Sequence, residues 1–196
     1  NCINNADITA KYGPTGSAHA MVAAGIMANT QGGKTVIFDN CTNNGSITAI
    51  HNDNSESTVG GGIFGYSYYA TDGKIGFIGC VNNGSLDVQG AKVLSGDILG
   101  GFGTTATTPV NIFVKDCNAG NKECDFSSVG KYDKGQAEAL LTVSNGNVSK
   151  VYYMGSNGLD KPINTNGGSE DWKEITISSA VAYDWDAKTL TFTYTA

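Results

Sequence analysis

The chain has 196 residues, of which only 15% are charged, and its formal net charge is −6. All 12 basic residues are lysine and they form no cluster, so the composition argues against nucleic acid as a partner. The sequence has no run of about 18 apolar residues, so no membrane-spanning helix is predicted in this segment. Because the first residue is Asn1, we expect a processed chain or an excised piece.

A cysteine followed by a pair of asparagines marks the start of each repeat. The pattern Cys-x-Asn-Asn begins at Cys2, Cys41 and Cys80, which are 39 residues apart. A degenerate fourth copy begins at Cys117, after a step of 37 residues. Asn-Gly follows in the second and third copies, and both residues tolerate positive φ, so the motif is expected to form a corner.

Two further landmarks lie between the cysteines. Glycine-rich segments, expected at bends where side chains would collide, occur at residues 23–26, 61–65 and 100–103. Apolar segments rich in β-branched and aromatic residues, which predict strands, lead into the next cysteine at residues 36–40, 75–79 and 111–116. Each repeat therefore contains two or three short strands separated by Gly and Asn corners.

Units this thin cannot bury an apolar face alone, so they must stack on their neighbours. The predicted fold is all-β: a parallel β-helix, or β-solenoid, of about three to four rungs over residues 1–130. Stacking places equivalent residues in columns about 4.8 Å apart. The expected structural columns contain Cys2, Cys41, Cys80, Asn44, Asn83, Gly62 and Gly101. We expect the cysteines to form an inward ladder, because free cysteine packs as a small apolar residue.

Residues 131–196 lack both the cysteines and the 39-residue phase. Two apolar segments, 140–144 and 148–154, flank Asn145-Gly146, which is a strong hairpin signal. The last segment alternates threonines with Leu190, Phe192 and Tyr194, as expected of a half-buried strand. We predict an antiparallel β region that packs on or caps the solenoid.

The motifs Gly-Gly-Ile-x-Gly, at 61–65, and Cys-x-Asn-Asn-Gly-Ser-Ile, at 41–47, resemble a known class of repeats. These are the GLUG-type and related Gly-Gly-hydrophobic-x-Gly repeats of secreted and surface proteins of bacteria and some protists. The resemblance covers residues 1–120. It implies part of a large adhesin-like or protease-accessory protein with a non-catalytic surface role. It implies no functional residues, because the shared motif is a folding motif.

Cys117 and Cys124 flank a short loop and are a candidate disulfide, which an extracellular setting would favour; free thiols are the equal alternative. No metal site is predicted, since the chain has no Cys-x-x-Cys and no suitably spaced histidine. No cofactor is expected either. Four asparagines match the N-glycosylation pattern, which matters only for a eukaryotic source: Asn40, Asn44, Asn83 and Asn147.

The most distinctive exposed candidate for ligand binding is the tyrosine group Tyr66, Tyr68 and Tyr69. Aromatic faces can stack on sugar rings. Alternatively, Tyr68 and Tyr69 only cover the edge of a rung. Glycans are therefore one expected class of partner.

Many parallel β-helices are polysaccharide lyases or glycoside hydrolases, so a carbohydrate-active enzyme is the alternative function. Pectate-lyase-like enzymes generally rely on an arginine base, and this chain has no arginine. The available acidic residues show no recognisable pair of carboxylates for glycoside hydrolysis. They are Asp116, Glu123 and Asp125 near the candidate disulfide, and Glu170, Asp171, Asp184 and Asp186 in the C-terminal region. We therefore predict a non-catalytic structural or adhesive module of a secreted or cell-surface protein. Its partners are cell-surface molecules, glycans or further copies of itself, stacked head to tail into a filament or array.

Overall fold

The structure, a computed structural model, describes residues 1–12, 21–31, 35–52, 57–68, 74–104, 110–130, 132–135, 139–154, 172–177, 182–184, 189–191 and 194–195. Apart from one 3₁₀ turn, η1 (Phe126–Ser128), the regular structure of these residues is strand. The fold class is therefore all-β, as predicted. No helix in the described part of the chain is long and apolar enough to cross a membrane.

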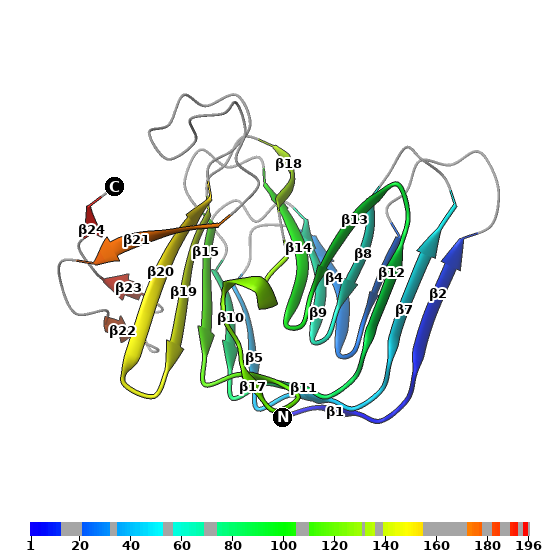
Figure 1. Cartoon of the computed structure of the whole chain (residues 1–196), viewed down its shortest axis with the longest axis horizontal. Coiled ribbons are helices and arrows are strands. Elements are labelled where there is room, and N and C mark those ends of the chain that lie inside the picture. The colour runs from blue at the N-terminus through cyan, green and yellow to red at the C-terminus, as the bar shows by residue number, and fades with distance from the viewer. Residues whose placement is uncertain are drawn as a thin grey trace.

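The chain passes through five sheets in the same order again and again (Figure 1). Sheet A contains β1 (Ile3–Asn4), β6 (Thr42–Asn43), β11 (Val81–Asn82), β16 (Asn118–Ala119) and β17 (Lys122–Glu123). Sheet B contains β2 (Ile8–Tyr12), β7 (Ile47–His51) and β12 (Leu86–Gln89). Sheet C contains β3 (Met21–Ala24), β8 (Ser57–Gly61) and β13 (Lys92–Gly96).

Sheets D and E complete each passage. Sheet D contains β4 (Met27–Gln31), β9 (Phe64–Tyr68), β14 (Leu99–Thr104) and β18 (Tyr132–Gly135). Sheet E contains β5 (Val36–Asp39), β10 (Lys74–Ile78), β15 (Val110–Lys115), β19 (Ala139–Asn145), β20 (Val148–Met154), β21 (Lys173–Ile177) and β24 (Tyr194–Thr195). A separate pair joins β22 (Ala182–Asp184) to β23 (Thr189–Thr191). We call each passage a rung. The first three rungs, 3–39, 42–78 and 81–115, contribute a strand to each of the five sheets, whereas the described strands of the fourth, 118–145, lie in sheets A, D and E.

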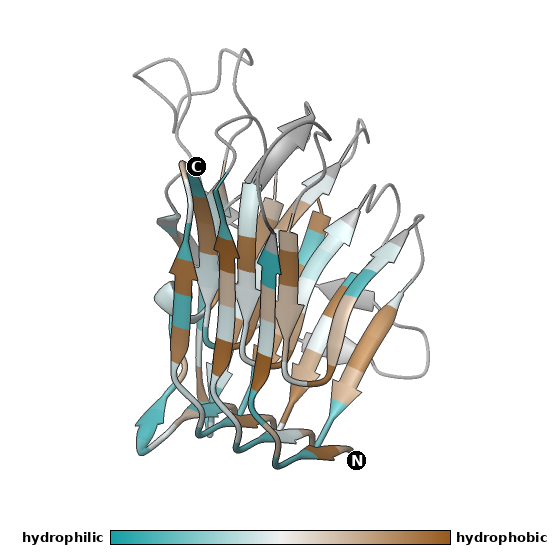
Figure 2. Cartoon of the chain, turned by 90° about the vertical axis from the view of Figure 1, so that its right-hand side faces the viewer, coloured by the Kyte–Doolittle hydropathy of each residue, from teal (hydrophilic) through white to brown (hydrophobic). Residues whose placement is uncertain are grey.

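The sequence period is also the stacking period in sheets A and B. Thr42 pairs in parallel with Ile3 and Val81, and Ile47 pairs with Ile8 and Leu86. Residues 39 apart thus lie side by side, and residues of similar hydropathy align across the strands (Figure 2). The predicted parallel strands are present, and each of the first three rungs has five of them instead of the two or three expected.

Sheets B, C, D and E are successive layers, with sheet A along the bottom (Figure 1). The main core lies between sheets D and E, where the Phe38 ring stacks on Phe77 with centroids 5.2 Å apart and also lies 5.2 Å from Phe64. Smaller clusters join the other layers, such as Ile47 with Ala23 between sheets B and C. Because apolar residues return at constant phase, the core is continuous from rung to rung.

The glycine column differs from the prediction. The bend after Gly61 stacks on the bend after Gly96, because Gly62 N donates to Gly96 O at 3.2 Å. The equivalent of Gly62 in the third rung is therefore Asp97, whereas Gly101 pairs with Tyr66 inside sheet D. The placement of Gly62 and Gly101 in one column was wrong, since the link between β12 and β13 is shorter than the link between β7 and β8 and shifts the phase.

The hairpin predicted around Asn145-Gly146 is confirmed: β19 and β20 pair antiparallel, and Gly146 has φ +56°. Strand β19 also pairs in parallel with β15, so the parallel pairing in sheet E continues past residue 130. In this sheet the strand direction first reverses after Asn145, where β20 begins the antiparallel pairing. On the far side β21 and then β24 add antiparallel strands. Of the predicted final strand, β23 and β24 are described and residues 192–193 lie outside the described part.

Candidate functional site

The first asparagine of each Cys-x-Asn-Asn motif points into the molecule and forms a ladder. Asn4 Nδ2 donates to Asn43 Oδ1 at 2.7 Å, and Asn43 Nδ2 donates to Asn82 Oδ1 at 2.8 Å. Asn43 is 0% exposed, and its amide also donates to Gly45 O at 2.8 Å. Each buried amide thus closes its own corner and bonds to the next rung, which satisfies groups whose burial would otherwise be costly.

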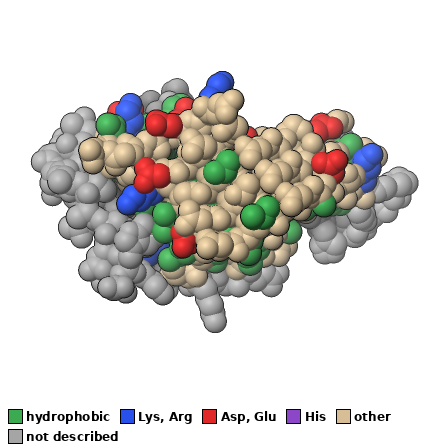
Figure 3. Space-filling view, turned by 90° about the horizontal axis from the view of Figure 1, so that it is seen from below, with side chains coloured by type: hydrophobic (Ala, Val, Ile, Leu, Met, Phe, Trp, Pro, Cys, Tyr) green, Lys and Arg blue, Asp and Glu red, His purple; other side chains and the backbone are tan. Residues whose placement is uncertain are grey.

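The second asparagine forms a parallel ladder on the surface. Asn44 Nδ2 donates to Asn5 Oδ1 at 2.7 Å, and Asn83 Nδ2 donates to Asn44 Oδ1 at 2.8 Å. Asn44 and Asn83 were expected in a structural column, and they lie in this one. Seen from below, the surface near sheet A shows mainly uncharged side chains and backbone, with scattered acidic groups (Figure 3). All four glycosylation candidates, including Asn40 and Asn147, are exposed.

Gly62 lies where the bend between sheets C and D crosses the buried ladder. A Cβ atom there would be 2.0 Å from Asp97 O and 2.4 Å from Asn82 Cγ. Gly25 has the same relation to Asn43 in the preceding rung. These glycines are required for close approach rather than for backbone freedom, as the bend prediction expected for Gly62.

The cysteine column is buried from the second rung onward. Cys41, Cys80 and Cys117 are 4%, 0% and 0% exposed, whereas Cys2 is exposed. The prediction of an inward position fails for Cys2, because the first rung has no preceding strand in the described chain to cover it. Burial raises the pKa of Cys41, as expected of an apolar packing role.

Cys117 and Cys124 are free thiols, so the candidate disulfide is not formed in this structure. The two residues face each other across β16 and β17, and Cys124 N donates to Cys117 O at 2.9 Å. The Cys117 sulfur has a different hydrogen-bond partner: Cys117 Sγ accepts from Cys80 N at 3.3 Å. A side-chain hydrogen bond between the Cys80 and Cys117 thiols, together with burial, raises the pKa of Cys117, and the same thiol–thiol bond lowers the pKa of Cys80 to about 7. Burial raises the pKa of Cys124 to about 12.

The tyrosine group does not form the exposed patch that was expected. Tyr66 is 1% exposed and packs against Val59 and Leu94 between sheets C and D. Its exposure was predicted wrongly because sheet D is covered on both faces. The side chain of Tyr68 and the whole of Tyr69 lie outside the described residues.

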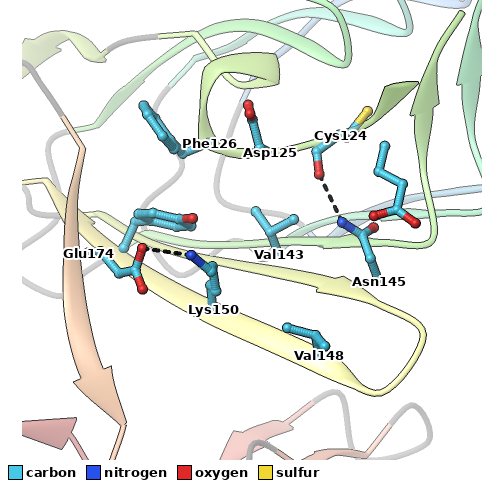
Figure 4. A pocket seen from close by; sticks show the side chains of 10 residues that line it. Cys124, Asp125, Phe126, Val143, Asn145, Val148, Lys150 and Glu174 are labelled. Carbon is cyan, nitrogen blue, oxygen red and sulfur yellow. Dashed lines mark hydrogen bonds and ion pairs between the residues drawn. The ribbon is translucent and has the colours of Figure 1, made fainter. Parts of the chain in front are cut away.

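A cavity of about 570 Å³ forms a groove between η1 and the β19–β20 hairpin. Figure 4 shows Asp125 and Phe126 on one wall, with Val143, Asn145, Val148 and Lys150 on the hairpin opposite. Glu174, on β21, closes one end. The remaining lining residues are Glu123, Cys124 and Tyr152.

Charged and aromatic groups alternate in this groove. Lys150 Nζ lies 3.1 Å from Glu174 Oε2, and this bond raises the pKa of Lys150. Asp125 caps η1 by accepting from Ser127 N at 2.8 Å. The Phe126 and Tyr152 ring centroids are 5.2 Å apart, and burial raises the pKa of Tyr152. The groove therefore offers carboxylates beside aromatic rings.

Sequence reasoning identified Glu123 and Asp125 as acidic residues near Cys124 but missed the groove. Glu174 and Tyr152 join it through antiparallel pairing of β20 with β21, which no local pattern reports. No protein-family model, curated protein or solved structure matches the chain. Among the described residues, no group of three or more His, Cys, Asp or Glu side chains is placed to hold a metal ion.

Proposed function

We propose that the chain is a non-catalytic structural or adhesive module of a secreted or cell-surface protein, and that its rungs form a parallel β-solenoid. The observation that carries this proposal is the use of the repeated polar residues. Hydrogen bonds link Asn4 to Asn43 and Asn43 to Asn82. The polar side chains that recur at the same position of each repeat therefore bond to the neighbouring rungs. A rigid stack of this kind is a spacer that holds other surfaces at a distance.

The resemblance to GLUG-type repeats supports a secreted or surface location, since those repeats occur in such proteins. The alternative function is a carbohydrate-active enzyme, for which the groove is the natural place. Two of its three carboxylates already have structural partners: Asp125 caps η1 and Glu174 bonds to Lys150. A glycosidase needs one carboxylic acid and one carboxylate that are both available to the sugar.

A turnover screen tests this choice. The purified chain is incubated with a panel of plant, bacterial and algal polysaccharides, and reducing ends and unsaturated sugars are measured. We expect no product above the level of a heat-denatured sample. Turnover that Glu123→Gln or Glu174→Gln abolishes, while the exposed-surface control Asp87→Asn retains it, would establish an enzyme instead.

Self-assembly is a second proposed property, because the sheets of the described segment have edge strands at both ends. Ile3, on edge strand β1, is 69% exposed, and the first-rung strands pair on one side only. At the other end, the outermost strands are β17, β12, β13, β18 and β24 of sheets A to E. Edge strands at both ends favour head-to-tail stacking of copies of this segment.

Sedimentation velocity over a range of concentrations tests self-assembly. We expect oligomers that Ile3→Lys weakens and that Val148→Lys, on the interior strand β20 of sheet E, leaves intact; Val148 is a matched control because it is 63% exposed. A strictly monomeric chain at high concentration would overturn this property, and it would leave the rigid-module function in place.

A further inference from the structure

The groove beside η1 contains more hydrogen-bond acceptors than donors. Its carboxylates are Glu123, Asp125 and Glu174, and its one basic side chain is Lys150. Lys150 already bonds to Glu174, so its charge is matched within the groove. The groove therefore has a net negative charge, and the formal net charge of the chain, −6, reinforces its potential.

Two acceptors in the groove are unused within the described part of the chain. Asn145 Oδ1 is buried and has no hydrogen-bond partner, although Asn145 Nδ2 donates to Cys124 O at 3.1 Å. Glu123 is exposed at the rim and has no ion pair among the described residues. Because Glu123 is exposed, its carboxylate is the acceptor that a ligand bringing N–H groups can reach.

An aromatic surface lies directly beside these acceptors. Phe126 is 42% exposed although it is a large apolar side chain, and its ring is tilted by 44° against Tyr152. Figure 4 shows Phe126 and Asp125 side by side on the η1 side of the groove, across from the hairpin. A cation placed against an aromatic face and next to a carboxylate is attracted by both.

We propose that the groove binds the guanidinium group of an arginine presented by a protein partner. The proposal rests on the adhesive role proposed above and specifies the chemistry of the partner. A guanidinium has five donors and no acceptor, stays charged at physiological pH and stacks on aromatic rings. It therefore complements an acceptor-rich groove with an exposed phenylalanine.

The composition of the chain bears on the source of this arginine. The 196 residues given contain no arginine, so another copy of this segment does not supply the guanidinium. A neutral glycan could donate hydroxyl groups to the same acceptors, but it would leave the negative charge uncompensated. A basic protein segment is therefore favoured over both a glycan and a second copy of this segment.

Calorimetric titration with the peptide acetyl-Gly-Arg-Gly-amide tests the proposal. The matched ligand replaces arginine with citrulline, which keeps the shape and removes the charge. We expect saturable binding of the arginine peptide and little binding of the citrulline peptide. Binding of the arginine peptide should be weaker at about 0.5 M salt, because salt screens the attraction between the guanidinium and the carboxylates. Neutral oligosaccharides are titrated in parallel.

Variants locate the binding. Glu123→Gln and Glu174→Gln should each weaken binding about threefold to tenfold, and Phe126→Ala about threefold. Asp87→Asn, an exposed carboxylate on β12 in sheet B, makes the same charge change elsewhere and should leave binding unchanged. Urea midpoints within error of the parent chain exclude misfolding as the cause of any loss.

The proposal is overturned if the arginine peptide does not bind, if the citrulline peptide binds equally, or if a neutral oligosaccharide binds in its place. It is also overturned if Asp87→Asn weakens binding as much as the groove variants do. None of these results affects the proposed non-catalytic function, which the polysaccharide turnover screen tests separately.

Discussion

Replacing Asn43 by alanine should destabilise the chain far more than the same replacement at Asn44. Asn43 is fully buried, and its side chain takes part in three hydrogen bonds, with Asn4, Gly45 and Asn82. Each is worth about 1 kcal/mol net, and buried partners that lose a bond add a desolvation cost. We therefore expect Asn43→Ala to lower the free energy of unfolding by about 2–4 kcal/mol.

Asn44→Ala is the matched control. Asn44 is the adjacent residue of the same type, and its side chain makes two inter-rung hydrogen bonds in an exposed position. Water replaces those bonds, so the expected loss is at most about 1 kcal/mol. Urea unfolding followed by circular dichroism measures both variants against the parent chain. Equal losses, or a larger loss for Asn44→Ala, would refute the assignment of the inner ladder as the stabilising one.

Three further predictions follow from the same packing. Gly62→Ala should lower the free energy of unfolding, measured in urea, by more than about 3 kcal/mol, because its Cβ would lie 2.0 Å from a backbone atom. Gly120→Ala, where φ is +58° and no atom lies within 4 Å of the added Cβ, should cost about 1–2 kcal/mol. Similar losses at both sites would contradict the close approach at Gly62. Ellman's reagent should label Cys2 rapidly in the native chain and the other four thiols only after denaturation; any missing thiol in the denatured, unreduced sample would indicate a disulfide. The pKa of Cys124 is raised from 9.0 to about 12, so its contribution to stability is complete below pH 9 and is lost as the pH rises from 9 towards 12. The parent chain should therefore lose more stability over that range than the Cys124→Ala variant. Parallel plots of unfolding free energy against pH for the two proteins would refute this.

The sequence predicted the features that depend on period and local chemistry. The 39-residue spacing corresponds to the register of sheets A and B, Cys41 and Cys80 are buried, and Asn145-Gly146 forms a hairpin. These follow from stacking and turn propensity, which need no knowledge of the other sheets. A strand of two residues is too short to show an alternation of apolar and polar side chains. Which of Asn43 and Asn44 points inward could therefore be decided only from the structure.

The errors come from long-range effects. Gly101 was misplaced because a shortened link shifts the phase in the third rung, and periodicity alone does not detect such a deletion. Tyr66 was expected at the surface because the sequence does not report that sheet C covers sheet D. The groove was missed because it joins segments from residue 123 to residue 174.

Backbone nuclear Overhauser contacts in an isotopically labelled chain test most directly whether the repeats stack in register. The parallel ladder predicts contacts between residues 39 apart, such as Thr42 with both Ile3 and Val81, together with contacts between the side-chain amides of Asn43 and Asn82. The side-chain amide protons of Asn43 should also exchange with solvent much more slowly than the side-chain amide protons of Asn44. Contacts at a different offset, antiparallel contacts between β6 and β11, or equally fast exchange at both asparagines would contradict the stacked arrangement and the function proposed from it.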